Sequence, residues 1–279
     1  MRGDTGFPVR LRFSKRGKVR FVSHRDLART FERAFRVAAL PLAFTQGFSP
    51  RPKVSLGLAL GVGHESDAEY LDLELVEPIE IDRLAGALAG ALPEGVEVDG
   101  VAQLVPRAPA LQEAITTVEY HLRPAALSGR ALHDTVARAL AADELRIETT
   151  RKGRPVVEDL RPGIFRLVVL DDDLLHAEVA TKPRGIRPSE LLGLLHRVAD
   201  INHDAAADRV LRTKQWIERD GARHEPLAAD RAPRASDDAR DMSKGLIDVG
   251  RHDHTRDERG APAGQGFGSD RAIRDRRIA

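Results

Sequence analysis

The chain has 279 residues, enough for one large or two modest domains, and its formal net charge is only +1. It contains no cysteine, which excludes disulfides, thiolate zinc sites, cysteine nucleophiles and any iron–sulfur cluster held by its own thiolates. No apolar run approaches the roughly 20 residues that span a bilayer, and residues 1–13 lack the apolar run of a secretory signal. We therefore expect a cytoplasmic protein with no membrane partner.

Charge is distributed unevenly over the first hundred residues. Residues 1–53 carry a net charge of +10, whereas residues 54–101 contain eleven acidic side chains and a single basic one, Arg83. Separated charge of this kind bears on partners and association rather than on the fold.

The first third of the chain predicts a strand, a helix, two strands, a helix and a strand. Their hydrophobic periodicity places them at 9–13, 24–40, 54–60, 70–76, 82–92 and 96–101. Ser23 is the expected N-cap of the first helix, and Pro41 ends that helix. This element order is that of a ferredoxin-like domain, an antiparallel sheet with two helices on one face.

A similar order returns after a linker at 104–112. The pattern predicts strands at 115–122, 145–149, 164–170, 174–179 and 210–217, helices at 128–140 and 188–198, and an extra hairpin in the middle. We therefore predict an α+β fold of two tandem ferredoxin-like (βαββαβ) units, at 7–103 and 113–218. Apolar residues become sparse beyond this point, so residues 219–279 are expected to form a disordered mixed-charge tail.

Four arginines recur on one face of the first helix. At about 100° per residue they fall within about 80° of one another, opposite the apolar side chains. They are Arg25, Arg29, Arg33 and Arg36. Guanidinium groups match phosphate oxygens bidentately, so this face predicts phosphate binding. The alternative is a solvated face that the acidic residues downstream neutralise in part.

His24 stands in the first turn of this helix, where the helix dipole favours a neutral imidazole. It is the candidate general base, or a residue that reads a ligand by hydrogen bonding. A structural role is the alternative, because no second catalytic group is evident. Asp26 is expected to be a favourable acid beside the helix N-terminus.

The segment QGFSPRPK is a loop that its prolines stiffen. It combines a glycine, an aromatic, a hydroxyl and two cations, which suits an RNA backbone with a base stacked on the aromatic ring. The candidate binding residues are Gln46, Gly47, Phe48, Ser49, Pro50, Arg51 and Lys53. A rigid turn between two strands is an equally good interpretation.

Further cations cluster in predicted loops of the second unit. They are Lys152, Arg154, Arg161, Arg184 and Arg187, the last two just ahead of a helix N-terminus, which favours anions. Together with the first helix they indicate an anionic ligand contacted by both units. We predict no metal site, because the acidic run of Glu65, Asp67 and Glu69 is typical of a solvated face.

Several strings of the sequence carry a family resemblance: SHRDL, RAFRVAALPLAFTQGFSPRPKVSLGLALGVG and SDAEYLD, followed by RKGRPVVEDLRP and GIRPSELL in the second half. Together they resemble a bacterial family of uncharacterised domains associated with radical S-adenosylmethionine enzymes. The match extends roughly over residues 7–217. Arg25 and Arg51 depart from the family pattern, in which a leucine and a histidine are more usual.

The resemblance implies a domain that is either fused behind a radical enzyme module or free-standing, with no established activity. This chain is expected to be the free-standing form. A radical enzyme needs three cysteines for its cluster, so the resemblance implies a partner enzyme in trans and no cofactor bound by this chain.

Three functional hypotheses follow. The leading one is a non-catalytic accessory protein that binds an anionic substrate, in particular RNA, for a radical enzyme. The second is a metal-independent endoribonuclease, by analogy with tandem ferredoxin-like CRISPR-type enzymes, with His24 activating a ribose 2′-hydroxyl. The third is a protein scaffold whose acidic segment docks a partner. The sequence leaves the oligomeric state open.

Overall fold

The computed structural model describes residues 6–151, 153–202 and 207–233. Every element named below belongs to one compact unit, which ends at Ala232. Among the described residues, no helix has both the length and the apolar character needed to cross a membrane.

The first half of this unit contains seven elements. They are β1 (Phe7–Lys15), a 3-10 helix η1 (Gly17–Phe21), α1 (His24–Val37), β2 (Val54–Leu56), β3 (Glu65–Leu75), α2 (Ile81–Ala89) and β4 (Val98–Gln103). The second half continues with α3 (Leu111–Ala114), β5 (Thr117–Arg123), α4 (Gly129–Ala141), β6 (Arg146–Arg151), β7 (Arg154–Asp159), η2 (Arg161–Gly163), β8 (Ile164–Asp171), β9 (Leu174–Ala180), α5 (Pro188–Val198), β10 (Arg209–Arg219), β11 (Ala222–His224) and α6 (Pro226–Ala229).

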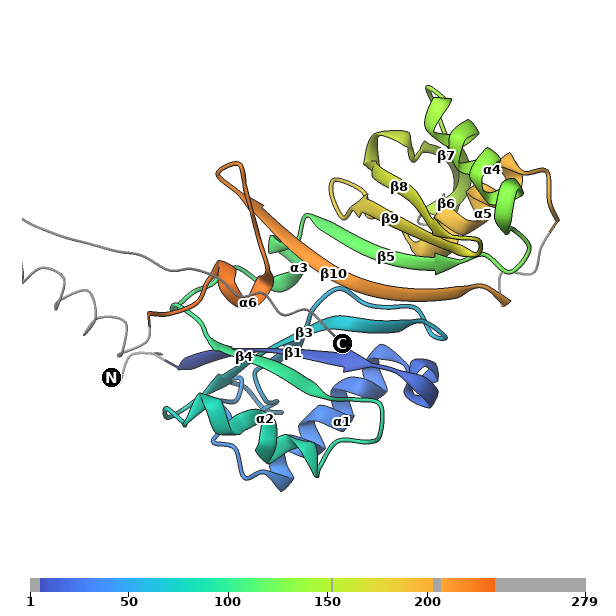
Figure 1. Ribbon diagram of the computed structural model, residues 1–279. Coiled ribbons are helices and arrows are strands. Elements are labelled where there is room, and N and C mark those ends of the chain that lie inside the picture. The colour runs from blue at the N-terminus through green and yellow to red at the C-terminus, as the bar shows by residue number, and fades with distance from the viewer. Residues whose placement is uncertain (1–5, 152, 203–206, 234–279) are drawn as a thin grey trace, which may run out of the picture. The chain divides into compact units, whose positions relative to one another are not determined.

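One nine-stranded sheet joins the two halves (Figure 1). Its strand order is β4-β1-β3-β10-β5-β9-β8, with β2 added to β3 and β11 added to β10. All of these pairings are antiparallel except that of β3 with β10, which is parallel and involves Leu211 opposite Glu65 and Arg212 opposite Ser66. A separate hairpin pairs β6 with β7. The predicted α+β class is therefore confirmed, whereas β7 of this hairpin lies in a segment that was expected to be a loop.

Helices α1 and α2 lie on the same side of strands β4, β1 and β3 (Figure 1). The apolar face predicted for the first helix is buried there, at Leu27, Phe31, Ala34 and Phe35. Phe31 packs edge-on against Phe13 of β1, with ring centroids 4.6 Å apart. A second apolar cluster lies beneath α4 and α5, against β5 and β9.

Helix caps only partly follow the sequence pattern. The Ser23 hydroxyl accepts a hydrogen bond from the Asp26 amide at 3.2 Å, so the predicted cap of α1 is confirmed. Ser128 does occupy the N-cap position of α4, but its side chain makes no capping bond.

Arg154, expected in a loop, is instead the first residue of β7.

Ordered structure extends past the predicted start of the tail at residue 219, through β11 and α6; residues 234–279 lie outside the described part of the chain. This extension covers a buried arginine. Arg10 of β1 is fully buried, pairs with Asp72 at 2.7 Å and donates to the Pro226 carbonyl at 3.0 Å. Tyr70 of β3, the strand next to β1, donates a hydrogen bond from its hydroxyl to the Glu225 carboxylate. These polar contacts hold a segment that has few apolar residues.

We predict that ending the chain after Arg219 destabilises it. Two hydrogen bonds to charged groups, at Arg10 and at Glu225, would be lost at about 1.5–3 kcal/mol each, so the free energy of unfolding should fall by about 3 kcal/mol or more. Urea unfolding of this chain and of one ending after Pro233 provides the comparison. Equal free energies for the two would show that α6 does not support β1.

Candidate functional site

A buried ion pair joins β10 to β3 inside the sheet. The guanidinium Nη1 of Arg212 donates to Glu69 Oε1 at 2.8 Å and to the Leu58 carbonyl at 2.9 Å. Both side chains are buried, Arg212 with 2% of its surface exposed. Burial lowers the pKa of Arg212 and the Glu69 carboxylate raises it, and the net shift is upward. Arg212 therefore carries a permanent charge, and it also fixes the loop that enters β3.

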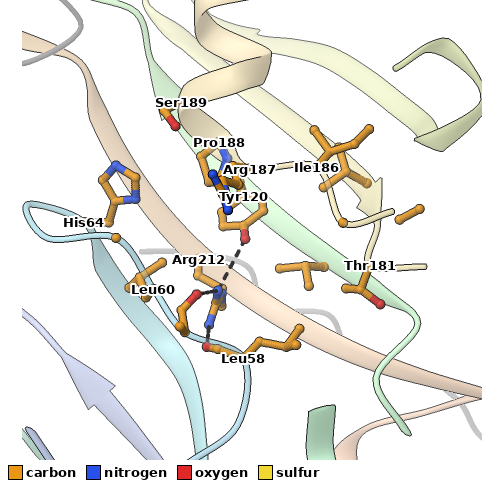
Figure 2. Close-up of a pocket in the computed structure, with 16 residues that line it drawn as sticks. Leu58, Leu60, His64, Tyr120, Thr181, Ile186, Arg187, Pro188, Ser189 and Arg212 are labelled. Carbon is orange, nitrogen blue, oxygen red and sulfur yellow. Dashed lines mark hydrogen bonds between the residues drawn. The ribbon is translucent and has the colours of Figure 1, made fainter. Parts of the chain in front are cut away.

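A pocket of about 400 Å³ opens next to this pair (Figure 2). One wall is the loop of residues 58–64, and the other consists of β5, the end of β9 and the first turn of α5. Its apolar lining includes Leu58, Leu60, Val118, Tyr120, Ile186 and Pro188, and its polar lining includes His64, Arg187, Ser189 and Arg212. A pocket of this size, largely apolar with a few convergent polar groups, is typical of a ligand site.

Two histidines and a lysine surround the buried arginine. Desolvation, helped by Arg212 and Lys15, lowers the pKa of His64. Desolvation also lowers the pKa of His24, where Lys15 and Arg212 act in the same direction and Glu69 opposes them. Both imidazoles are therefore neutral near pH 7.

Lys15 itself is almost completely buried, and its ammonium donates to the Val22 carbonyl at 2.9 Å. Desolvation lowers its pKa, whereas Glu69 raises it. His24 and His64 are neutral, so the charged side chains of this cluster are one carboxylate, Glu69, and two cations, Lys15 and Arg212. This cluster has one positive charge in excess.

The arginine face of α1 is exposed to solvent along its length. Arg29 pairs with Asp26 at 3.1 Å, but both side chains are more than half exposed. Within the described residues, Arg25, Arg33 and Arg36 form no ion pair. These three guanidinium groups are available to an external anion.

The acidic residues downstream pair with other cations. Asp67 binds Arg16 of the loop after β1, Asp72 binds Arg10, Glu74 binds Lys53 and Asp99 binds Arg12. These ion pairs neutralise the arginines of β1 and of the loop that follows it. They do not reach α1, so the charge asymmetry of the sequence persists on the surface of that helix.

The loop Gln46–Lys53 presents an aromatic ring to solvent. Phe48 is fully exposed at its tip, next to Gly47, whose φ of 130° favours glycine. Below the tip, the Thr45 amide donates to the Arg51 carbonyl and the Arg51 amide donates to the Thr45 hydroxyl. Lys53 is engaged by Glu74 at 3.1 Å, so its ammonium is less available than expected.

The predicted cations of the second half separate into two kinds. Arg184 is held between Glu158 and Glu190, and Arg161 donates to backbone carbonyls that include Ala142. These two arginines support the fold. Arg187 lies at the pocket and has no ion pair among the described residues, and Arg154 is exposed. Lys152 lies outside the described residues.

Sequence reasoning missed three residues that line the pocket, His64, Tyr120 and Arg212, and also the buried Lys15 nearby. A signal for Arg212 was available. It occupies the buried phase of β10, two residues after buried Val210. A charged residue at such a position must find a partner, because an unpaired buried charge is very costly. The described residues contain no cluster of three or more His, Asp or Glu side chains suited to a metal ion.

A family model described as "Uncharacterized protein conserved in bacteria (DUF2344)" matches residues 9–188. No curated protein matches the chain. Among solved structures, the chain is similar to one titled "Crystal Structure of a Cbf5-Nop10-Gar1 Complex", with 11% identity and a TM-score of 0.39. That match covers 77% of this chain and 54% of the other, so the chain spans about half the length of its solved relative. The likeness is too distant to bear on function.

We predict that Glu69→Ala lowers the free energy of unfolding by about 3–5 kcal/mol, because Arg212 would remain as an uncompensated buried charge. Replacing both residues by leucine should restore much of this loss. Glu80→Ala, which breaks an exposed pair with Arg83, is the control and should cost no more than about 1 kcal/mol. Similar urea midpoints for Glu69→Ala and Glu80→Ala would contradict a central role for the buried pair.

Proposed function

We propose that this chain, which belongs to the bacterial family of uncharacterised conserved proteins (DUF2344), is a non-catalytic protein that binds single-stranded RNA. In this proposal the arginine face of α1 contacts phosphates and the loop Gln46–Lys53 contacts bases. The protein would present the RNA to a separate radical S-adenosylmethionine enzyme in trans. We also propose that residues 7–103 and 113–218 each form a ferredoxin-like unit.

The main support is that three of the four arginines of α1 form no ion pair within the described residues. Arg25, Arg33 and Arg36 are exposed and unpaired within the described residues, although acidic side chains are abundant in the same half of the unit. Like charges at this spacing slightly destabilise a helix, by a few tenths of a kcal/mol per pair. An exposed row of guanidinium groups suits the phosphates of a nucleic acid, which it can bind bidentately.

Phe48 favours a single strand over a duplex. A fully exposed phenylalanine at a loop tip has no packing role in the chain, and aromatic rings in RNA-binding proteins stack on unpaired bases. Such stacking contributes about 1–3 kcal/mol per base and tolerates different sequences. A strand whose phosphates follow α1 and whose bases reach the loop would therefore be bound with little sequence preference.

A second candidate function is metal-independent RNA cleavage. The observation that favours it is the neutral state of His24, because a general base must be unprotonated at the working pH. His64 adds a second neutral imidazole near the same cations. Lys15 and Arg212 would supply positive charge near the reacting phosphate.

The third candidate, protein docking through the acidic segment, has less support. Asp72 and Glu74 already pair with Arg10 and Lys53, so they present less free negative charge than the sequence indicates. Reversing their charge would break these internal pairs as well as any docking contact.

We predict that the full chain binds a poly(U) oligomer with a strong dependence on salt. Four or five phosphate contacts give a slope of about −3 for log K against log salt, at about 0.7 per contact. Arg33→Ala should reduce the magnitude of the slope by about 0.7. Fluorescence anisotropy over about 50 to about 200 mM salt measures it. Arg138→Ala, an exposed arginine of α4, is the control. No binding at low salt, or equal slopes in both variants, would refute the proposed surface.

The leading proposal assigns no chemistry to this chain. We therefore predict that His24→Ala does not change the amount of labelled RNA that is cleaved in the presence of the protein. His133→Ala on α4 is the matched control, since His133 is exposed and lies outside the site. Gel electrophoresis after incubation in a chelator measures the products. Metal-independent cleavage that disappears only in His24→Ala, with RNA binding retained, would replace the leading proposal by the second candidate.

A further inference from the structure

The pocket beside Arg212 has no part in the RNA surface proposed above. It is bounded by the loop of residues 58–64 from the first half of the unit and by β5, β9 and α5 from the second half. Hydrogen bonds from Arg212 to the carbonyls of Leu58 and Ala59 hold this loop in place. The cavity is therefore built by fixed elements, which suits a preformed binding site.

The polar groups around the pocket are mainly cations and hydrogen-bond donors. Arg187 is exposed at the rim and unpaired within the described residues. Ser189, in the first turn of α5, also lines the pocket (Figure 2). His64 lies on the opposite wall, and its Nδ1 has no hydrogen-bond partner among the described residues. A ligand that complements these groups must be rich in acceptors.

The electrostatic balance near the pocket also favours an anion. The buried cluster of Lys15, Arg212 and Glu69 has one positive charge in excess, and Arg187 adds another at the rim. No carboxylate lines the pocket within the described part of the chain. The nearest carboxylate to Arg187, that of Glu190, is paired with Arg184 and accepts from the Arg187 amide at 3.0 Å, so an anionic group in the pocket would meet attraction from the lining cations.

The remaining lining is apolar. Leu58, Leu60, Val118 and Ile186 line it together with the ring of Tyr120. Apolar walls of this kind bind a flat or compact organic group by excluding water from it. The pocket therefore combines an anion-binding rim with an apolar interior of about 400 Å³.

Arg212 connects this pocket electrostatically with the first turn of α1. Its guanidinium lines the pocket and interacts with His24, the first residue of that helix. An unpaired nucleotide has both parts that the cavity requires, a phosphate and a base with a π-face.

We propose that this pocket binds one nucleoside monophosphate unit, with its phosphate at Arg187 and Ser189 and its base against the apolar walls. The naming of a nucleotide rests on the proposed function, in which the unit is an unpaired residue of the bound RNA. A free nucleotide has the same chemistry and is the other source.

Isothermal titration of the full chain with UMP and AMP tests this inference, with uridine and inorganic phosphate as partial ligands. At least one nucleotide should bind, and each partial ligand should bind more weakly than that nucleotide. Arg187→Ala, which removes a charged hydrogen-bond donor, should weaken nucleotide binding about tenfold or more. Ala59→Phe, at an exposed position of the lining, should obstruct the cavity and weaken it as well. Arg166→Ala, an exposed arginine of β8 outside the pocket, should have no effect.

The outcomes separate this inference from the proposed function. The pocket assignment is overturned if neither nucleotide shows saturable binding, or if Arg187→Ala and Ala59→Phe leave nucleotide binding unchanged. This holds even if poly(U) still binds with the salt dependence expected for α1. Retained nucleotide binding with no poly(U) binding supports the pocket as a site for free nucleotides and refutes the RNA surface. Weakening of both ligands by the two pocket variants supports insertion of an RNA nucleotide.

Discussion

The hydrogen-bonded pair of Arg212 and Glu69 connects most features of this structure. Strands β3 and β10 share only two residue pairs in their parallel register, so side chains must contribute to the contact between them. Arg212 does so by binding Glu69 of β3 and the carbonyls of Leu58 and Ala59. The same guanidinium lines the pocket and helps to keep both neighbouring histidines neutral. The joined sheet, the cavity and the local electrostatics thus depend on one buried charge.

Local features of the fold were predictable because they depend on nearby residues. The amphipathic pattern of α1 identified its buried face, and Ser23 was recognised as its cap from the residue type and position alone. The alternating strands were recognised for the same reason, although their ends differ by a few residues. The contact between β3 and β10 was not predictable in this way. Arg212 and Glu69 are 143 positions apart, and no periodicity links them.

The candidate site shows the same division between local and remote information. Exposure of the α1 arginines follows from helical geometry. That three of them form no ion pair within the described residues depends on which distant cations the carboxylates bind. Asp72 of β3 pairs with Arg10, its direct neighbour on strand β1, and Arg184, predicted to bind an anion, is held by Glu158 and Glu190. Sequence reasoning therefore selected candidate cations without distinguishing a free cation from a structural one. The segment after Arg219 extended the ordered part of the chain because Glu225 and Pro226 bind partners in the first half.

The central claim is that α1 and the loop Gln46–Lys53 form the surface that contacts RNA. Photo-crosslinking of the full chain to a 4-thiouridine-containing single strand, followed by peptide mass spectrometry, tests it most directly. The account predicts crosslinks at Phe48 and in the peptides of α1, with none in the peptides of β8 and α4. Crosslinks concentrated on β8 or α4, or no crosslink above that of a control protein, would contradict it.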